Sequence, residues 1–213
     1  MKIAIFGASG WIGGTVAREA LGRGHAVSAI VRDPARLQLS GKGLSVVPGD
    51  VTDPASISSA VAGVDAVAAA IGGRREAHHE VVPTAARALL TGLAGAGVKR
   101  LVWVGGAGSL EVAPGVCLID TPQFPAEWKA EALAQAEALK LFRASIGGVE
   151  WSFLSPPAML EPGQRSGRYR TGSDQLLVDD KGVSRISVED YAVALVDELE
   201  RPAHPRQRFT VAY

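Results

Sequence analysis

The stretch IFGASGWIGG, residues 5–14, decides the fold of this chain. Its glycines Gly7, Gly10 and Gly13 recur at every third position, directly after the apolar run KIAIF and at the start of an amphipathic segment. A strand, a glycine turn and a helix in this order are typical of a dinucleotide-binding unit. Gly7 would permit the tight turn, Gly10 the close approach of a pyrophosphate, and Gly13 the packing of helix on strand. A tight turn without a ligand is the alternative that the motif leaves open.

Apolar runs rich in β-branched residues alternate with amphipathic segments rich in alanine and leucine. Such alternation requires crossover connections, which produce a parallel sheet with helices on both faces. The sequence therefore predicts a Rossmann-like, doubly wound α/β fold, as a single NAD(P)-binding domain over 1–213. We expect strands at 2–6, 26–31, 44–49, 64–71, 99–104, 149–154 and 207–213, and helices at 11–24, 53–61, 80–97 and 126–145.

Two segments interrupt this rhythm and are expected to form loops on the substrate side of the sheet. The segment 105–128 is rich in glycine and proline. The segment 155–187 is rich in proline, glycine and arginine, and we expect it to form a small C-terminal cap beside the sheet.

Composition narrows the class of protein. The 213 residues include 22 basic and 22 acidic side chains, so no charge imbalance points to nucleic acid or to an anionic membrane. Cys117 is the single cysteine, which excludes an internal disulfide and suggests a reducing compartment. The N-terminus has no signal-peptide pattern and no apolar run reaches 18 residues. We expect a cytoplasmic monomer or homodimer. No metal site is predicted, because the neighbouring His78 and His79 have no second ligand cluster.

Several motifs carry a family resemblance. The spacing G-x-x-G-x-x-G with Ser9 inside it, followed in order by IVRDPARL (30–37), RLVWVGGAGS (100–109), FLSPPAML (153–160) and RISVEDYA (185–192), resembles the short-chain dehydrogenase/reductase superfamily in its extended and atypical branches. The similarity extends over nearly the whole chain. It is closest to the NAD(P)H-flavin reductases and the biliverdin-IXβ/flavin reductase group, which have NmrA-like relatives.

The end of the second strand bears on which dinucleotide is bound. Asp33 follows Gly13 by 20 residues but precedes Pro34, so we expect it to cap a short helix rather than to bind ribose. Arg32 and Arg36 are four residues apart and could close on one 2′-phosphate. The similar reductases place a phosphate-contacting arginine where this chain has Arg74. We therefore predict NADPH over NADH, with three solvated surface arginines as the alternative.

The remaining cofactor contacts are expected at the carboxyl ends of the parallel strands. Asp50 and Val51 should meet the adenine, and the resemblance implies that Pro156 and Pro157 flank the nicotinamide. The predicted cofactor-binding residues are Gly7, Ala8, Ser9, Gly10, Trp11, Ile12, Gly13, Arg32, Arg36, Asp50, Val51, Ala70, Ile71, Gly72, Gly73, Arg74, Gly105, Gly106, Pro156, Pro157 and Ala158.

The usual acid/base motif of the superfamily, Tyr-x-x-x-Lys, is absent, because none of the three tyrosines has a lysine four residues later. Register with the family places that pair at Glu131 and Gln135, which have different chemistry. The serine that follows strand five in similar reductases aligns with Gly106. Ser109, three residues later, is the candidate catalytic residue, and a loop hydroxyl is the alternative.

Hydride delivery to a flavin or a similar conjugated acceptor needs no fixed proton donor, because solvent can supply the proton. We therefore expect an NADPH-dependent reductase of a small conjugated acceptor, with flavin as a substrate rather than a bound cofactor. A non-catalytic NADPH-sensing protein of NmrA-like type, and an epimerase or dehydratase, are the alternatives.

The acceptor is expected between the two substrate-side loops. Phe124 and Trp128 could stack on a flat ring, although plain packing would explain them as well. Arg165, Arg168 and Arg170 could meet an anionic group at the rim, or form a solvated basic loop.

Overall fold

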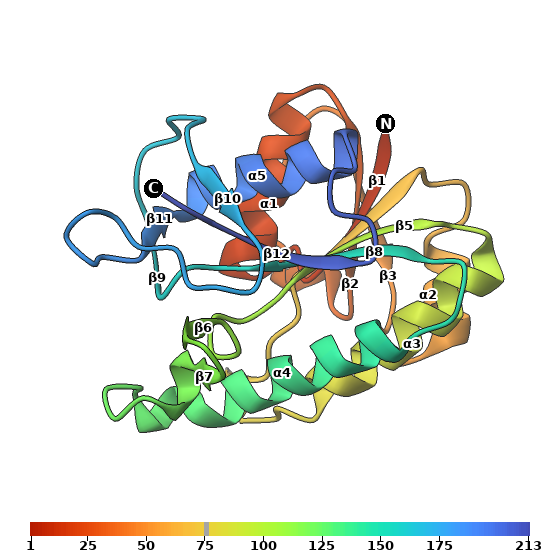
Figure 1. Cartoon of the computed structure of the whole chain (residues 1–213). Helices are drawn as coiled ribbons and strands as arrows, with labels where there is room; N and C mark the ends of the chain where they lie inside the picture. Colours follow the sequence, from red (N-terminus) through yellow and green to blue (C-terminus); the bar gives the residue numbers. More distant parts are fainter. Residues whose placement is uncertain (75–76) are drawn as a thin grey trace.

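The computed structural model describes residues 1–74 and 77–213. An eight-stranded sheet runs through the middle of the molecule (Figure 1). Seven of its strands are parallel, and the last, at one edge, is antiparallel to its neighbour. This arrangement confirms the predicted Rossmann-like, doubly wound fold. In spatial order the strands are β10 (Arg170–Gly172), β12 (Gln207–Ala212), β8 (Glu150–Ser155), β5 (Arg100–Val104), β4 (Ala66–Ala69), β1 (Lys2–Phe6), β2 (Ala26–Val31) and β3 (Leu44–Pro48).

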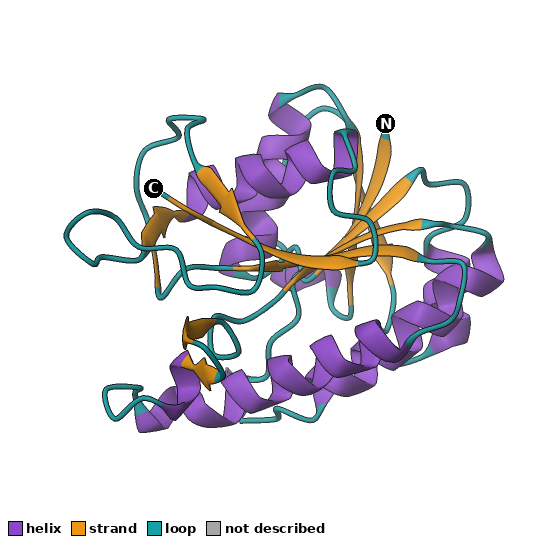
Figure 2. Ribbon diagram, in the orientation of Figure 1, coloured by secondary structure: helices purple, strands orange, loops and turns teal. Residues whose placement is uncertain are grey.

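Helices cover both faces of the sheet (Figure 2). On one face α1 packs against α5, and on the other α2 packs against α3, which packs against α4. Each face has its own buried apolar cluster. Because both faces are covered, β4 and β5 are buried along their whole length, which explains their continuous apolar sequences. The helices are α1 (Trp11–Gly22), α2 (Pro54–Ala60), α3 (Val81–Ala96), α4 (Lys129–Ala144) and α5 (Val188–Glu200).

Local sequence sets where the helices begin. The carboxylate of Asp53 accepts hydrogen bonds from the N–H groups of Ala55 and Ser56 and so caps α2. Asp33 caps the three-residue 3-10 helix η1 (Pro34–Arg36) in the same way. The predicted helix over 126–145 starts with a separate 3-10 turn, η4 (Ala126–Trp128), which leads into α4.

The segment 155–187 differs from the expected cap beside the sheet. Part of it, β10, extends the main sheet by pairing with β12. The edge of β12 would otherwise expose a row of unpaired backbone groups, which β10 satisfies. The segment also forms a small parallel pair between β9 (Met159–Glu161) and β11 (Arg185–Ser187).

The segment 105–128 folds into a hairpin of β6 (Glu111–Ala113) and β7 (Val116–Cys117), followed by the 3-10 turn η3 (Leu118–Asp120). The buried guanidinium of Arg208 on β12 ties both irregular segments to the sheet. It donates hydrogen bonds to Ser109 in one segment and to the carboxylate of Asp174 in the other. Among the described residues, no helix has the length and apolar composition needed to cross a bilayer.

Candidate functional site

A pocket with a volume of about 1010 Å³ lies at the carboxyl ends of the central strands. Its lining includes residues that end or directly follow β1, β2, β3, β4, β5 and β8. Ligands of doubly wound sheets bind at this edge. The volume is at the upper end of the range of roughly 300–1,000 Å³ found for ligand sites, so the pocket is large enough for an extended ligand.

The glycine turn forms one wall of the pocket. Gly7 has a φ of +82°, and a Cβ atom there would lie 2.2 Å from the carbonyl oxygen of Ala70. A Cβ atom on Gly13 would lie 2.2 Å from the carbonyl oxygen of Gly7. Gly10, the N-cap of α1, offers no side chain to the first N–H groups of the helix. The turn is therefore a cradle that only glycine can form, with helix N–H groups open toward the pocket.

The structure brings nearly all the predicted cofactor-binding residues into the lining of this one pocket. Ala8 is the exception, because its side chain is buried in the apolar cluster beneath α1 and α5. The predicted acceptor-side residues Phe124 and Trp128 also line the pocket.

Charged groups gather where β2 and β3 end. Arg32 and Arg36 are exposed and line the pocket there. The carboxylate of Asp50 accepts hydrogen bonds from the backbone N–H of Thr52, 2.8 Å away, and from its hydroxyl, 2.7 Å away. These bonds, with a smaller contribution from the charge of Arg32, hold the pKa of Asp50 below its ordinary value. The carboxylate of Asp33 accepts the N–H of Ala35, as the capping prediction required.

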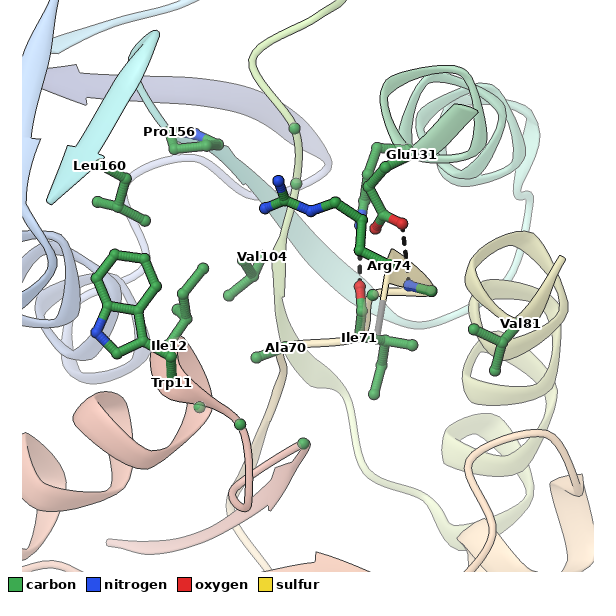
Figure 3. Close-up of a pocket in the computed structure, with 18 of the residues that line it drawn as sticks. Trp11, Ile12, Ala70, Ile71, Arg74, Val81, Val104, Glu131, Pro156 and Leu160 are labelled. Carbon is green, nitrogen blue, oxygen red and sulfur yellow. Dashed lines mark hydrogen bonds between the residues drawn. The ribbon is translucent and has the colours of Figure 1, made fainter. Parts of the chain in front are cut away.

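The opposite wall comes from α4, which contributes Glu131 and Gln135. Gln135 is buried, accepts a hydrogen bond from the Trp103 indole at 3.0 Å, and donates one to the Ile71 carbonyl at 2.9 Å. Glu131 accepts a hydrogen bond from Gly73 N–H at 3.0 Å (Figure 3). It also accepts one from the His79 ring at 2.8 Å. Both residues line the pocket, so α4 fixes the segment that follows β4.

Sequence reasoning placed Glu131 and Gln135 by register but gave them no part in the site. Helical spacing could have found them, because residues 131, 132 and 135 share one face of α4 and all line the pocket. Met159 and Leu160 were also missed. They line the pocket because β9 turns back over it directly after Pro156 and Pro157.

The structure corrects the prediction for Ser109. Its hydroxyl accepts a hydrogen bond from Arg208 at 3.0 Å, and it lies outside the pocket lining. Gly105, Gly106, Ala107 and Gly108 line the pocket, and Ser109 is the first residue of this segment to face β12 instead. Ser109 is therefore a structural hydroxyl, the alternative that the sequence left open.

The predicted basic rim is also corrected. Arg165 binds Glu19 of α1 through two hydrogen bonds of 2.7 and 2.8 Å. Arg168 is exposed, and Arg170 donates to the carbonyl groups of Tyr213 and Val178. None of the three lines the pocket. Glu19 therefore holds Arg165 on α1, and the backbone carbonyl groups of Val178 and Tyr213 hold Arg170.

Arg74 is the third arginine of the pocket lining. Its guanidinium lies over the Trp128 ring, 5.8 Å from the ring centroid. In the sheet, β1 separates β4 from β2, so Arg74 starts two strands away from Arg32. In the described part of the chain, no cluster of three or more histidine, cysteine, aspartate or glutamate side chains is arranged to hold a metal ion.

Comparison with known proteins agrees with this site. Residues 7–199 match the family described as NAD(P)H-binding. The chain is 42% identical to YwnB of Bacillus subtilis, an uncharacterized protein, over 99% of this chain and 98% of that one. It is 26% identical to the NAD(P)H azoreductase of Xenophilus azovorans, over 98% of this chain and 67% of that one.

Two solved structures have the same architecture. A Burkholderia pseudomallei protein, described as a candidate exported protein, is 47% identical with a TM-score of 0.91, and all of both chains is covered. A candidate NADH-flavin reductase from Streptococcus pneumoniae is 34% identical with a TM-score of 0.87, covering 100% of this chain and 99% of that one. The fold and pocket define a dinucleotide-binding protein with a Rossmann-like, doubly wound sheet. The chain belongs to the NAD(P)H-binding family.

Proposed function

We propose that this protein is an NADPH-dependent reductase that transfers hydride to a small conjugated acceptor such as flavin. One observation carries the proposal: a single pocket extends from the glycine turn and Arg32 to an aromatic wall of Phe124 and Trp128. A dinucleotide seated on the turn would fill only part of that length. The aromatic wall suits a flat second molecule placed beside the nicotinamide.

The residues present fit the cofactor. The glycine cradle would hold the pyrophosphate at the start of α1, since any side chain on Gly7 or Gly13 would meet backbone atoms. Arg32 and Arg36 would hold the 2′-phosphate through charge-assisted hydrogen bonds. Bound nicotinamide supplies the hydride, and the protein aligns the two rings and excludes water between them.

The names of two similar proteins support an acceptor of this class. One relative is named for flavin reduction and one for azo reduction. Both acceptors are flat and conjugated, and neither requires the Tyr–Lys pair that this chain lacks. A sugar-type epimerase or dehydratase is less well supported, because those enzymes rely on that pair.

A non-catalytic NADPH-sensing protein is the second candidate, and one observation favours it. Gln135, in the place of the family's lysine, uses both ends of its amide to brace Trp103 and Ile71. A pocket braced in this way could bind the dinucleotide without any chemistry following.

A turnover assay separates the two candidates. The purified protein is mixed with NADPH and, in turn, with FMN, riboflavin or a soluble azo dye, and NADPH oxidation is followed by its absorbance. We expect acceptor-dependent oxidation. Tight NADPH binding with no oxidation by any of these acceptors would contradict the reductase and support the sensor.

The preference for NADPH is tested by Arg32→Ala. The loss of hydrogen bonds to a charged phosphate, worth about 1.5–3 kcal/mol, should weaken NADPH binding by about ten- to a hundredfold and leave NADH binding unchanged. Arg168→Ala, outside the pocket, is the control and should change neither affinity. NADH binding more tightly than NADPH to the unaltered protein would contradict the assignment.

A cytoplasmic location and a monomeric or homodimeric state stay predictions.

A further inference from the structure

The guanidinium of Arg74 lies in the part of the pocket that is left for the acceptor. Figure 3 shows it projecting between Pro156 and Val104, which follow or end β8 and β5, and pointing away from the Glu131 carboxylate. It lies 5.8 Å from the centroid of the Trp128 ring, at the start of α4. Arg32 and Arg36 line the same pocket where β2 ends, Arg32 just before η1 and Arg36 as its last residue.

The chain around Arg74 is held in place. The Gly73 N–H donates a hydrogen bond to one oxygen of Glu131 at 3.0 Å. The Nδ1 atom of the His79 ring lies 2.8 Å from the same oxygen. The N–H of His78 also donates to the carbonyl of Gly73 at 3.0 Å. A Cβ atom on Gly73 would lie 2.4 Å from the carbonyl oxygen of His78, so the backbone there is closely packed. Glu131 thus anchors the residue immediately before Arg74.

Among the described residues, the acidic side chain nearest to Arg74 along this wall is committed to other partners. Glu131, the acidic residue of this wall, is engaged by Gly73 and His79 rather than by Arg74. Within the part of the chain that the structure describes, no carboxylate forms an ion pair with the Arg74 guanidinium. A guanidinium held over an aromatic face keeps its planar fork of donors free for a carboxylate, sulfonate or phosphate.

We propose that the acceptor carries an anionic group beside its flat conjugated ring, and that Arg74, supported by Trp128, is the residue that selects it. Glu131 is the positioning residue that holds the segment carrying Arg74. The inference rests on the proposed reductase function and adds the charge of the substrate to it.

FMN and riboflavin form a matched pair for the test, because they share the isoalloxazine ring and differ by one phosphate. Values of kcat/KM are measured for both flavins with the unaltered protein, Arg74→Gln, Arg74→Lys and the control Arg168→Gln. We expect the unaltered protein to prefer FMN by about ten- to a hundredfold, as hydrogen bonds to a charged group allow. Arg74→Gln should remove this preference, because the KM for FMN should rise more than the KM for riboflavin. Arg74→Lys should restore part of it, and Arg168→Gln should leave it intact.

Other outcomes overturn the inference. Equal kcat/KM values for the two flavins with the unaltered protein would do so, and so would an unchanged ratio in Arg74→Gln. If Arg74→Gln weakens NADPH binding and slows both flavins equally, Arg74 serves the dinucleotide phosphates and not the acceptor.

Failure of the proposed function has a different signature. Absence of turnover with both flavins, despite NADPH binding, contradicts the reductase. Calorimetric titration of FMN and of riboflavin into the NADP⁺-loaded protein then still measures the preference for the anionic flavin. Equal affinities there would overturn the role of Arg74 independently.

The positioning role of Glu131 has its own test. Glu131→Gln keeps an oxygen that can accept the Gly73 N–H, whereas Glu131→Ala removes it. We expect Glu131→Ala to lower the preference for FMN and Glu131→Gln to retain most of it. Equal FMN preference in both variants and the unaltered protein would remove Glu131 from this role.

Discussion

The packing of α1 on the glycine turn makes Gly13→Ala the most informative single substitution. An added Cβ atom would lie 2.2 Å from the carbonyl oxygen of Gly7 and 2.7 Å from its carbonyl carbon. Both distances fall well short of the roughly 3.5–4.0 Å separation at which carbon contacts are favourable. Both atoms are backbone, so no rotamer change can relieve the overlap, and helix and turn must separate.

The expected cost follows from this geometry. Overpacking of a well-packed core costs about 1–3 kcal/mol, and the higher helix propensity of alanine recovers up to about 1 kcal/mol of it. We expect the free energy of unfolding to fall by about 1–2 kcal/mol. Displacement of the turn also moves the N–H groups that would hold the pyrophosphate, so NADPH affinity should fall by at least about tenfold.

Gly22→Ala, at the other end of the same helix, is the matched control. No atom lies within 4 Å of a Cβ atom added there, and the residue is exposed. Alanine should raise stability by about 0.5–1 kcal/mol and leave NADPH affinity unchanged. Urea unfolding followed by circular dichroism gives the stabilities, and NADPH fluorescence titration gives the affinities. If Gly13→Ala matched Gly22→Ala in both measurements, the assignment of the turn as the pyrophosphate seat would be refuted.

Three further outcomes test the energetics of the fold. Glu198 is 3% exposed, and its carboxylate lies 2.7 Å from the Arg100 guanidinium. Glu198→Gln leaves this buried cation unpaired and should lower the free energy of unfolding in urea by about 3–5 kcal/mol. The surface substitution Glu137→Gln is the control and should change it by less than about 0.5 kcal/mol. Burial alone would raise the pKa of Glu198, but hydrogen bonds and the Arg100 charge outweigh it and hold the pKa below the ordinary 4.5. This stabilisation is therefore complete above that value and is lost as the pH falls through the folded-state pKa, so a urea midpoint that does not decrease in acid would contradict it. Tyr213→Phe removes the hydroxyl that lies 2.7 Å from the Asp190 carboxylate and should cost about 1–2 kcal/mol; an unchanged thermal midpoint would show that this bond does not stabilise the C-terminal strand.

Much of the fold could be predicted because its determinants are local. Strands such as β4 and β5 are continuously apolar because both their faces are covered. Asp53 begins a helix by accepting N–H groups two and three residues later, an interaction that the sequence itself contains. The short strand β10 could not be predicted, because its pairing depends on the free edge of β12, a strand about forty residues further along the chain.

In the candidate site, too, the residues placed by local sequence differ from those placed by distant partners. The residues predicted at the ends of parallel strands line one pocket, since the topology brings all those ends to one edge. Long or loop-borne polar side chains were predicted poorly. Arg165 was expected at the pocket but binds Glu19, and Ser109 was expected at the acceptor but binds Arg208. In each case the partner is about a hundred or more residues away in the chain.

By itself, the sequence determined the alternation of strands and helices and the glycine turn of residues 7–13. It also determined the absence of a Tyr-x-x-x-Lys pair. The alternation follows from the spacing of apolar residues, and the turn follows from the backbone conformations open to glycine. Both are encoded within a few neighbouring residues. Only the tertiary structure decided that Glu131 anchors the chain beside Arg74 and that Arg74 lies over Trp128. A flexible side chain takes its direction from the partner that the fold presents to it, and that partner comes from a distant part of the chain.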